Sequence, residues 1–475
     1  MSAAEPTSLS LPAPRPRRTV LLYALFLVAG LGAFFAVRYV GEGLAEAAPV
    51  VQPEAPAAPS SSVAHLLLAL AAVLLAGRLL GLVFMRFKEP PVIAEVVAGI
   101  VLGPSLLGQI SPEAMRFVFP ADAAPQLGAL AQVGVITYLF LVGLELNTAP
   151  FRQHVQSTAF IAHVSMIVPF LGGAILALLL FPGFAPSGVS FTPFALFLGV
   201  SLAVTAFPVL ARILSDLRLT QTPLGALALL TAAIDDISAW TLLALVVGIV
   251  QADASGAGAV MLYSLLFLAF MVLFARPAVA WFTLLYEARE DLRPRLLPWV
   301  FVPLLLAALA TEAIGIHALF GAFLLGALVP HESKLTEDLT QRLELPVTGL
   351  LLPAFFAYTG LRTQIGLVQG TEAWLICGLI ILVAAAGKIG GAYVAGRLTG
   401  LGHSTSLGLG ILVNTRGLME LIVLNVGLEM GILSPRLFAM LVLMALVTTL
   451  MTAPLLSFLA KPHAKKNLAS GDTVG

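Results

Sequence analysis

Long apolar runs follow one another along almost the whole chain, and only short polar turns separate them. Because about 20 apolar residues cross a bilayer as a helix, the pattern predicts fourteen membrane-spanning helices. Their predicted bounds are 19–40, 63–85, 90–108, 125–146, 157–181, 193–214, 222–250, 257–285, 297–312, 315–330, 346–362, 372–399, 404–428 and 433–460. Since nearly all of the chain lies in these runs, the sequence predicts no separate soluble domain.

The first run, residues 19–40, fits two interpretations. Basic residues before it and the small residues Ala45 and Ala47 after it are also typical of a signal peptide. The apolar run is longer than the usual ~7–15 residues of a signal peptide, so we favour a retained helix. Residues 1–18 are then a cytoplasmic segment, 41–62 an external Pro/Ala-rich linker, 63–460 one transmembrane domain and 461–475 a short cytoplasmic tail.

Composition places the chain among membrane proteins. Hydrophobic residues make up 59% of it and charged residues 11%, whereas a soluble domain carries about a quarter charged residues. Lys plus Arg and Asp plus Glu are equal in number, at 25 each, so net charge predicts no nucleic-acid partner. The single cysteine, Cys377, excludes a disulfide framework within one chain and a cysteine-based metal cluster. We expect no cofactor.

Basic residues predict the orientation of the chain, because they stay on the cytoplasmic side in short loops. They recur at every second loop, as Arg86, Lys88, Arg152, Arg218, the segment 289–295, Lys334, Arg342 and Arg397. Arg116 and Arg362 are the main exceptions. Both termini are therefore predicted to be cytoplasmic, with a lipid bilayer around the domain.

Two adjacent aspartates, Asp235 and Asp236, lie near the middle of the uncharged run 222–250. One such charge costs roughly 2.5–3.5 kcal/mol on insertion scales, which makes it a functional-site hypothesis. Lys388 lies mid-span and can neutralise only one of them. Neighbouring helical residues point about 100° apart, so the other aspartate can face an aqueous cavity. A site of this kind holds protons or a small hard cation, and competition between the two is sufficient for antiport.

Two other predicted spans are interrupted. Pro208 removes one helical hydrogen bond and clashes with the carbonyl of Val204, and Asn414, Thr415 and Gly417 place polar and flexible residues at membrane depth. Such breaks in corresponding positions of two halves are a sequence sign of a transporter's central site. Carbonyls freed at a break can coordinate a cation.

Further polar residues surround these features. Arg416 and Glu420 are four residues apart, so they can pair on one helical face. Ser201, Thr205 and Ser238 can give oxygen ligands to a cation, or their hydroxyls can bond back to helix carbonyls; both roles stay open. Several glycines, Gly99, Gly103, Gly321 and Gly326, are expected to allow close helix packing.

Six motifs occur in order along the chain: FKEPPVIAEVVAGIVLGPSLLG (87–108), FLVGLELN (140–147), TAFPVLARIL (205–214), TAAIDDISAW (231–240), IHALFGAFLLGALVP (316–330) and NTRGLMELIVLNVG (414–427). Together they make residues 62–461 resemble the monovalent cation:proton antiporter-2 family. This family includes Kef-type potassium/proton exchangers and bacterial sodium/proton exchangers. Six motifs in order are specific, although one alone would be weak.

The resemblance implies an all-α polytopic membrane protein with the sodium/proton antiporter fold. It implies inverted repeats, a dimerisation domain, a mobile core domain and two crossed broken helices. Thirteen spans belong to the family pattern, and the N-terminal helix is extra. By the family's motif, Asp236 matches the ion-binding carboxylate, Asp235 the variable partner position and Lys388 the lysine that can pair there.

Function follows from the same resemblance as an expectation. The chain is expected to exchange a monovalent cation for protons by alternating access, as a homodimer in a bacterial inner membrane. Two acids at this site usually mean electrogenic exchange. The chain ends soon after its last span, without the Kef regulatory domain, which favours sodium over potassium; lithium also stays open.

Other classes of protein fit less well. Intramembrane aspartyl proteases also use two membrane-depth aspartates, but their GxGD motif is absent, and adjacent residues on one helix cannot face each other across a substrate. We therefore expect that the protein is not an enzyme. A sensor that binds ions without flux, or a cation channel, stays open as an alternative.

Overall fold

The structure is a computed structural model, and it describes residues 16–43, 63–86, 91–120, 123–145, 155–217, 219, 222–251, 257–314, 318–456 and 458–459. This part of the chain is helical and contains no strand. Ten of its helices are long and apolar enough to cross a membrane, and four shorter apolar helices accompany them. The prediction of an all-α polytopic membrane protein is confirmed, whereas the number of fourteen spans stays a prediction.

The first half of the chain forms α1 (Pro16–Gly41), α2 (Val63–Arg86), α3 (Pro91–Leu102), α4 (Leu107–Ile110), α5 (Pro112–Val118), α6 (Ala123–Glu145), α7 (Val155–Phe184), α8 (Phe191–Ala203), α9 (Phe207–Asp216) and α10 (Pro223–Gln251). Apolar residues surround most of these helices on all sides, as expected for helices that contact lipid and one another. The predicted span 193–214 corresponds to two helices, α8 and α9.

The second half forms α11 (Ala257–Phe270), α12 (Arg276–Ala288), α13 (Arg293–Leu296), α14 (Phe301–Ile314), α15 (Ala318–Leu328), α16 (Lys334–Pro346), α17 (Leu352–Arg362), α18 (Gly370–Leu398), α19 (His403–Val413), α20 (Leu418–Glu429) and α21 (Pro435–Leu450). Two π-helical turns, Met271–Ala275 and Val347–Leu351, join α11 to α12 and α16 to α17. The predicted span 346–362 is therefore the second part of a longer helical segment. The predicted division near His317 falls outside the described residues.

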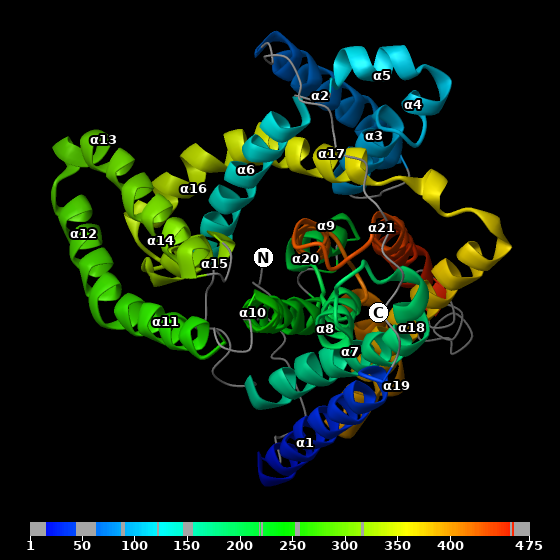
Figure 1. Cartoon of the computed structure of the whole chain (residues 1–475). Coiled ribbons are helices and arrows are strands. Elements are labelled where there is room, and N and C mark those ends of the chain that lie inside the picture. Colours follow the sequence, from blue (N-terminus) through cyan, green and yellow to red (C-terminus); the bar gives the residue numbers. More distant parts are fainter. Residues whose placement is uncertain are drawn as a thin grey trace, which may run out of the picture.

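The helices form two groups. In one, which we call the scaffold group, α17 packs on α3 and α6, α2 packs on α3, and α14 and α6 both pack on α15. In the other, the core group, α7 packs on α8, α10 and α18, α18 packs on α19 and α21, and α20 packs on α8 and α21. Figure 1 shows α8, α10 and α20 near the centre of the molecule, with α12 and α13 at one edge and α1 at another.

Glycines allow the closest helix contacts. A Cβ on Gly99 of α3 would lie 2.3 Å from the carbonyl oxygen of Ala357 on α17. On α15, a Cβ on Gly321 would lie 2.0 Å from the carbonyl oxygen of Ala307, and one on Gly326 2.2 Å from that of Phe140. These distances confirm the prediction that such glycines let helices approach closely.

The extra N-terminal helix α1 lies against the core group (Figure 1). The rings of Phe26 and Phe160 are 6.4 Å apart, and those of Phe34 and Phe170 are 5.7 Å apart, so two aromatic pairs join α1 to α7. At the end of α1, the Glu42 carboxylate accepts hydrogen bonds from Arg38 and from Thr192 at 3.0 Å. These hydrogen bonds lower the pKa of the Glu42 carboxyl.

Candidate ion-binding site

Two interrupted helices meet at the centre of the core group. α8 ends at Ala203 and α9 begins at Phe207, while α19 ends at Val413 and α20 begins at Leu418. The backbone N–H of Ala206 in the first break donates to the carbonyl of Thr415 in the second, at 3.0 Å. The predicted interruptions are thus present, and the two breaks are in direct contact.

The first break does not lie where the sequence placed it. It spans residues 204–206, and Pro208 occupies the first turn of α9. The first turn of a helix tolerates proline, because an N–H there has no helical partner anyway. Pro208 therefore begins the second half-helix rather than forming the break.

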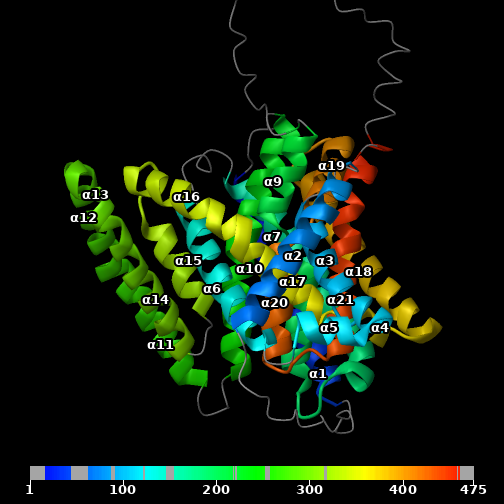
Figure 2. The same cartoon turned by 90° about the horizontal axis from the view of Figure 1, so that it is seen from above.

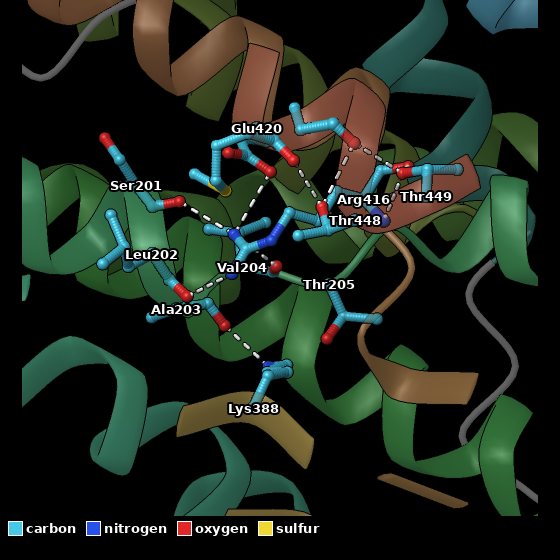
Figure 3. A network of polar contacts seen from close by, with 12 residues as sticks. Ser201, Leu202, Ala203, Val204, Thr205, Lys388, Arg416, Glu420, Thr448 and Thr449 are labelled. Atoms are coloured by element: carbon cyan, nitrogen blue, oxygen red, sulfur yellow. Dashed lines mark hydrogen bonds and ion pairs between the residues drawn. The ribbon is translucent and has the colours of Figure 1, made fainter. Parts of the chain in front are cut away.

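Two buried cations hold the carbonyl end of α8 (Figure 3). The last four carbonyls of a helix lack helical partners and carry its negative partial charge. Here they are those of residues 201–204. The Arg416 guanidinium donates to the carbonyls of Ser201, Leu202 and Val204, and the Lys388 ammonium donates to that of Ala203 at 2.6 Å.

This finding changes the role of the first break. The sequence suggested that carbonyls freed at one of the two breaks can coordinate a cation. In the structure the protein's own cations already occupy those of the first break. The carboxylates of α10 are therefore the better candidate ligands.

Asp235 is the aspartate that faces Lys388. The Lys388 Nζ atom lies 2.7 Å from Asp235 Oδ2, and both side chains are almost completely buried. The Thr205 hydroxyl lies 2.7 Å from the same oxygen and 2.9 Å from the carbonyl of Val413. Thr205 thus joins both breaks to the acidic pair, as a hydrogen-bond donor within the protein.

Asp236 has a different environment from its neighbour. Its carboxylate interacts with the backbone N–H of Phe207, the first residue of α9, where the helix carries positive partial charge. The Oδ1 atoms of Asp235 and Asp236 are both buried without a hydrogen-bond partner in the described part of the chain. One aspartate pairs with Lys388 and the other does not, as the sequence predicted. Asp236 is 6% exposed, and the aqueous cavity beside it stays a prediction.

Arg416 and Glu420 form the predicted pair, at 3.2 Å between Nη1 and Oε2. Both side chains are completely buried. The backbone of Arg416 is fixed by Thr449 of α21, whose hydroxyl lies 3.0 Å from its nitrogen and 2.9 Å from its carbonyl oxygen. Sequence reasoning missed Thr449; its only signal was a pair of threonines, with Thr448, inside an apolar run.

Three other residues that the sequence singled out are the possible ligands Ser201 and Ser238 and the helix-break residue Asn414. The Ser201 hydroxyl donates back to the carbonyl of Phe197 at 2.7 Å, and the Ser238 hydroxyl lies 3.1 Å from His163 Nε2. Asn414 donates to the carbonyl of Thr448, while its Oδ1 has no partner in the described part of the chain. Ser201 thus shows the second of its two predicted roles, and cation binding by it or by Ser238 stays a prediction.

Two helices broken at membrane depth around a buried acidic pair are typical of a secondary transporter. The family model for the transmembrane region of sodium/hydrogen exchangers matches residues 66–461. The chain belongs to this family of monovalent cation:proton antiporters.

Three relatives illustrate the family. The Na(+)/H(+) antiporter NhaS4 of Synechocystis is 45% identical over 80% of this chain and 93% of its own length. Cation/H(+) antiporter 20 of Arabidopsis thaliana is 38% identical over 82% of this chain, and K(+)/H(+) antiporter 1 of Saccharomyces cerevisiae is 34% identical over 81%. The match covers 48% and 45% of those two proteins, so this chain spans about half of their length.

A solved structure also matches. It is that of the sodium proton antiporter MjNhaP1 from Methanocaldococcus jannaschii, with a TM-score of 0.49 and 15% identity. The match covers 82% of this chain and 95% of that one.

Proposed function

We propose that this protein exchanges a monovalent cation for protons across a membrane, with Asp236 as the main ion-binding carboxylate. The observation that carries the proposal is the asymmetry of the acidic pair. Asp235 Oδ2 lies 2.7 Å from both Lys388 Nζ and the Thr205 hydroxyl, whereas no cation pairs with Asp236 among the described residues. The Oδ1 atoms of both aspartates are buried without a partner there. A buried acceptor of this kind requires a proton or a cation, and these two occupants exclude each other.

Alternating access of such a site to the two sides of the membrane gives antiport. A cation that binds Asp236 on one side displaces a proton there, and a proton that binds on the other side displaces the cation. Asp235 adds a second carboxylate that can take up or release a proton with its neighbour. More protons than cations then move in each cycle, so we propose electrogenic exchange.

We favour sodium as the cation. The relative NhaS4, which this chain covers almost completely, is named a sodium antiporter, while the yeast relative is named a potassium antiporter. Potassium exchange is the alternative, and a channel or sensor on the same scaffold is a second one. We further propose a homodimer in a bacterial inner membrane, with both termini cytoplasmic.

Reconstituted liposomes test the proposal. The interior is made acidic, and internal pH is followed while sodium, potassium or lithium is added outside, with the membrane potential clamped or free. We expect one cation to make the interior more alkaline and the rate to depend on the potential. Asp236→Asn should abolish this exchange, because the neutral amide can neither release a proton nor neutralise a cation.

The matched control is Asp291→Asn, which makes the same change at an exposed aspartate between α12 and α13. It should exchange like the wild type. Full exchange by folded Asp236→Asn would exclude this site, and cation flux without proton movement would indicate a channel instead.

A further inference from the structure

Helix α17 of the scaffold group meets α20 of the core group (Figure 2). Polar side chains join the two helices there. The side-chain amide of Asn425 donates to the hydroxyl of Thr359 at 2.7 Å. One turn further along both helices, Arg362 Nη1 lies 2.9 Å from Glu429 Oε1. An ion pair and a hydrogen bond thus cross the same contact.

The Arg362 side chain is held from several directions. Its guanidinium carbon lies 5.3 Å from the centre of the Tyr358 ring, within the range of a cation–π contact. Its Nη1 also lies 3.5 Å from Asn425 Oδ1. The Arg362 and Glu429 side chains are 25% and 33% exposed, so this ion pair is partly accessible, unlike the buried one at the ion site.

Helix α20 links this contact to the ion site. Its first turn carries Glu420, which pairs with Arg416, and Arg416 holds the carbonyl end of α8. Asn425 and Glu429 lie further along the same helix, on the side that meets α17. A displacement of α20 relative to α17 would therefore also displace the groups around the ion site.

We propose that Arg362 and Glu429, with Thr359 and Asn425, form a latch that fixes the core group against the scaffold group in this conformation and opens once in each transport cycle. The proposal rests on the proposed function, since exchange at a central site needs one bundle to move against the other. The latch also explains why Arg362 departs from the rule that basic residues lie in cytoplasmic loops. Its place at the end of α17 lets it pair with Glu429.

Charge reversal tests the latch in the full-length protein. Arg362→Glu places two carboxylates together, and their repulsion prevents α20 from packing on α17. The conformation that the latch fixes is then lost from the transport cycle. We expect the initial rate of exchange to fall about fivefold or more. Arg362→Glu combined with Glu429→Arg restores the ion pair in reversed order and should recover at least about half of the wild-type rate.

Arg116→Glu is the matched control. This variant reverses an exposed charge on α5. The Arg116 Nε donates only to the carbonyl of Pro112 in the same helix among the contacts of the described residues. The variant's exchange rate should be that of the wild type. Loss of rate in Arg362→Glu and in Glu429→Arg, without recovery in the double variant, would assign Arg362 a purely structural role and overturn the latch.

Cross-linking provides a second test. In a Cys377→Ala background, cysteines replace Arg362 and Glu429, and a reductant-cleavable bis-methanethiosulfonate reagent joins them. We expect the reagent to stop the exchange that the double-cysteine protein retains and a reductant to restore it, whereas the reagent should leave the rate of each single-cysteine protein unchanged. Unchanged exchange after full cross-linking would overturn the latch.

Failure of the proposed function would be recognised separately. If wild-type liposomes show no cation-dependent proton movement, the antiport proposal fails. The latch is then judged by thermal unfolding of Arg362→Ala, Glu429→Ala and the double variant. The contact is supported if the double variant is no less stable than either single variant. It is overturned if the loss of stability in the double variant equals the sum of the two single losses.

Discussion

Lys388 both stabilises the ion site and neutralises one of its two aspartates. Its ammonium has two acceptors, Asp235 Oδ2 and the carbonyl of Ala203, and its side chain is completely buried. The aspartate belongs to α10 and the carbonyl to the end of α8. One charge therefore joins three helices of the core group.

Replacing Lys388 by methionine should destabilise the protein by about 3–5 kcal/mol, because it leaves Asp235 buried without its cation. The combined variant Asp235→Asn with Lys388→Met removes both charges and should regain most of this loss. Thermal unfolding of the purified proteins in one detergent measures both effects. A combined variant less stable than Lys388→Met would show that the ion pair does not carry the effect.

The acidic pair could be predicted from sequence because charges at membrane depth are rare and stand out in an apolar run. That Lys388 pairs with only one aspartate could also be predicted, because one ammonium cannot neutralise two carboxylates. Capping of α8 by Arg416 could not be predicted, because it joins residues more than 200 positions apart through backbone carbonyls that every sequence has. Nor could Thr449, since a threonine in a span usually bonds to its own helix, as Thr449 also does to Ala445.

At the scale of elements, the sequence predicted two interrupted spans and the structure brings the breaks together. The second break was placed correctly, because Asn414 to Gly417 combine polar and flexible residues. The first was placed at Pro208, whereas the helix stops at Ala203. Proline restricts the residue before it as well as its own turn, and sequence alone does not show on which side of it the helix resumes.

The contact of α3 with α17 should be sensitive to a single methyl group. Gly99→Ala would place its Cβ 2.3 Å from the Ala357 carbonyl oxygen, a backbone atom that cannot move aside without shifting a helix. We expect a destabilisation of about 1–3 kcal/mol. Thermal unfolding measures it.

Gly390→Ala is the control for Gly99→Ala. Gly390 lies within α18, and a Cβ there would have no atom within 4 Å. This variant should gain about 0.4–1 kcal/mol through a less flexible unfolded chain. Equal effects of the two substitutions would show that helix packing at Gly99 is not the cause.

At the scale of the whole molecule, α1 belongs to the core group. Helix α1 packs on α7 and also contacts α8, and it forms aromatic pairs with Phe160 and Phe170 of α7. Figure 1 shows α1 far from α17. A helix docked in this way would travel with the core group during transport. We propose that residues 19–40 are a retained helix, which these contacts would dock on the core group.

Intact mass spectrometry of protein purified from membranes distinguishes these two possibilities. We expect the measured mass to include residues 1–47, because cleavage after Ala47 would remove a helix that packs aromatic side chains against α7. Phe34→Ala should lower the stability of the purified protein, since Phe34 packs on Phe170, whereas Phe35→Ala should not, since Phe35 is 59% exposed. A mass that lacks the first 47 residues would identify the segment as a signal peptide and leave the observed docking of α1 without a role in the mature protein.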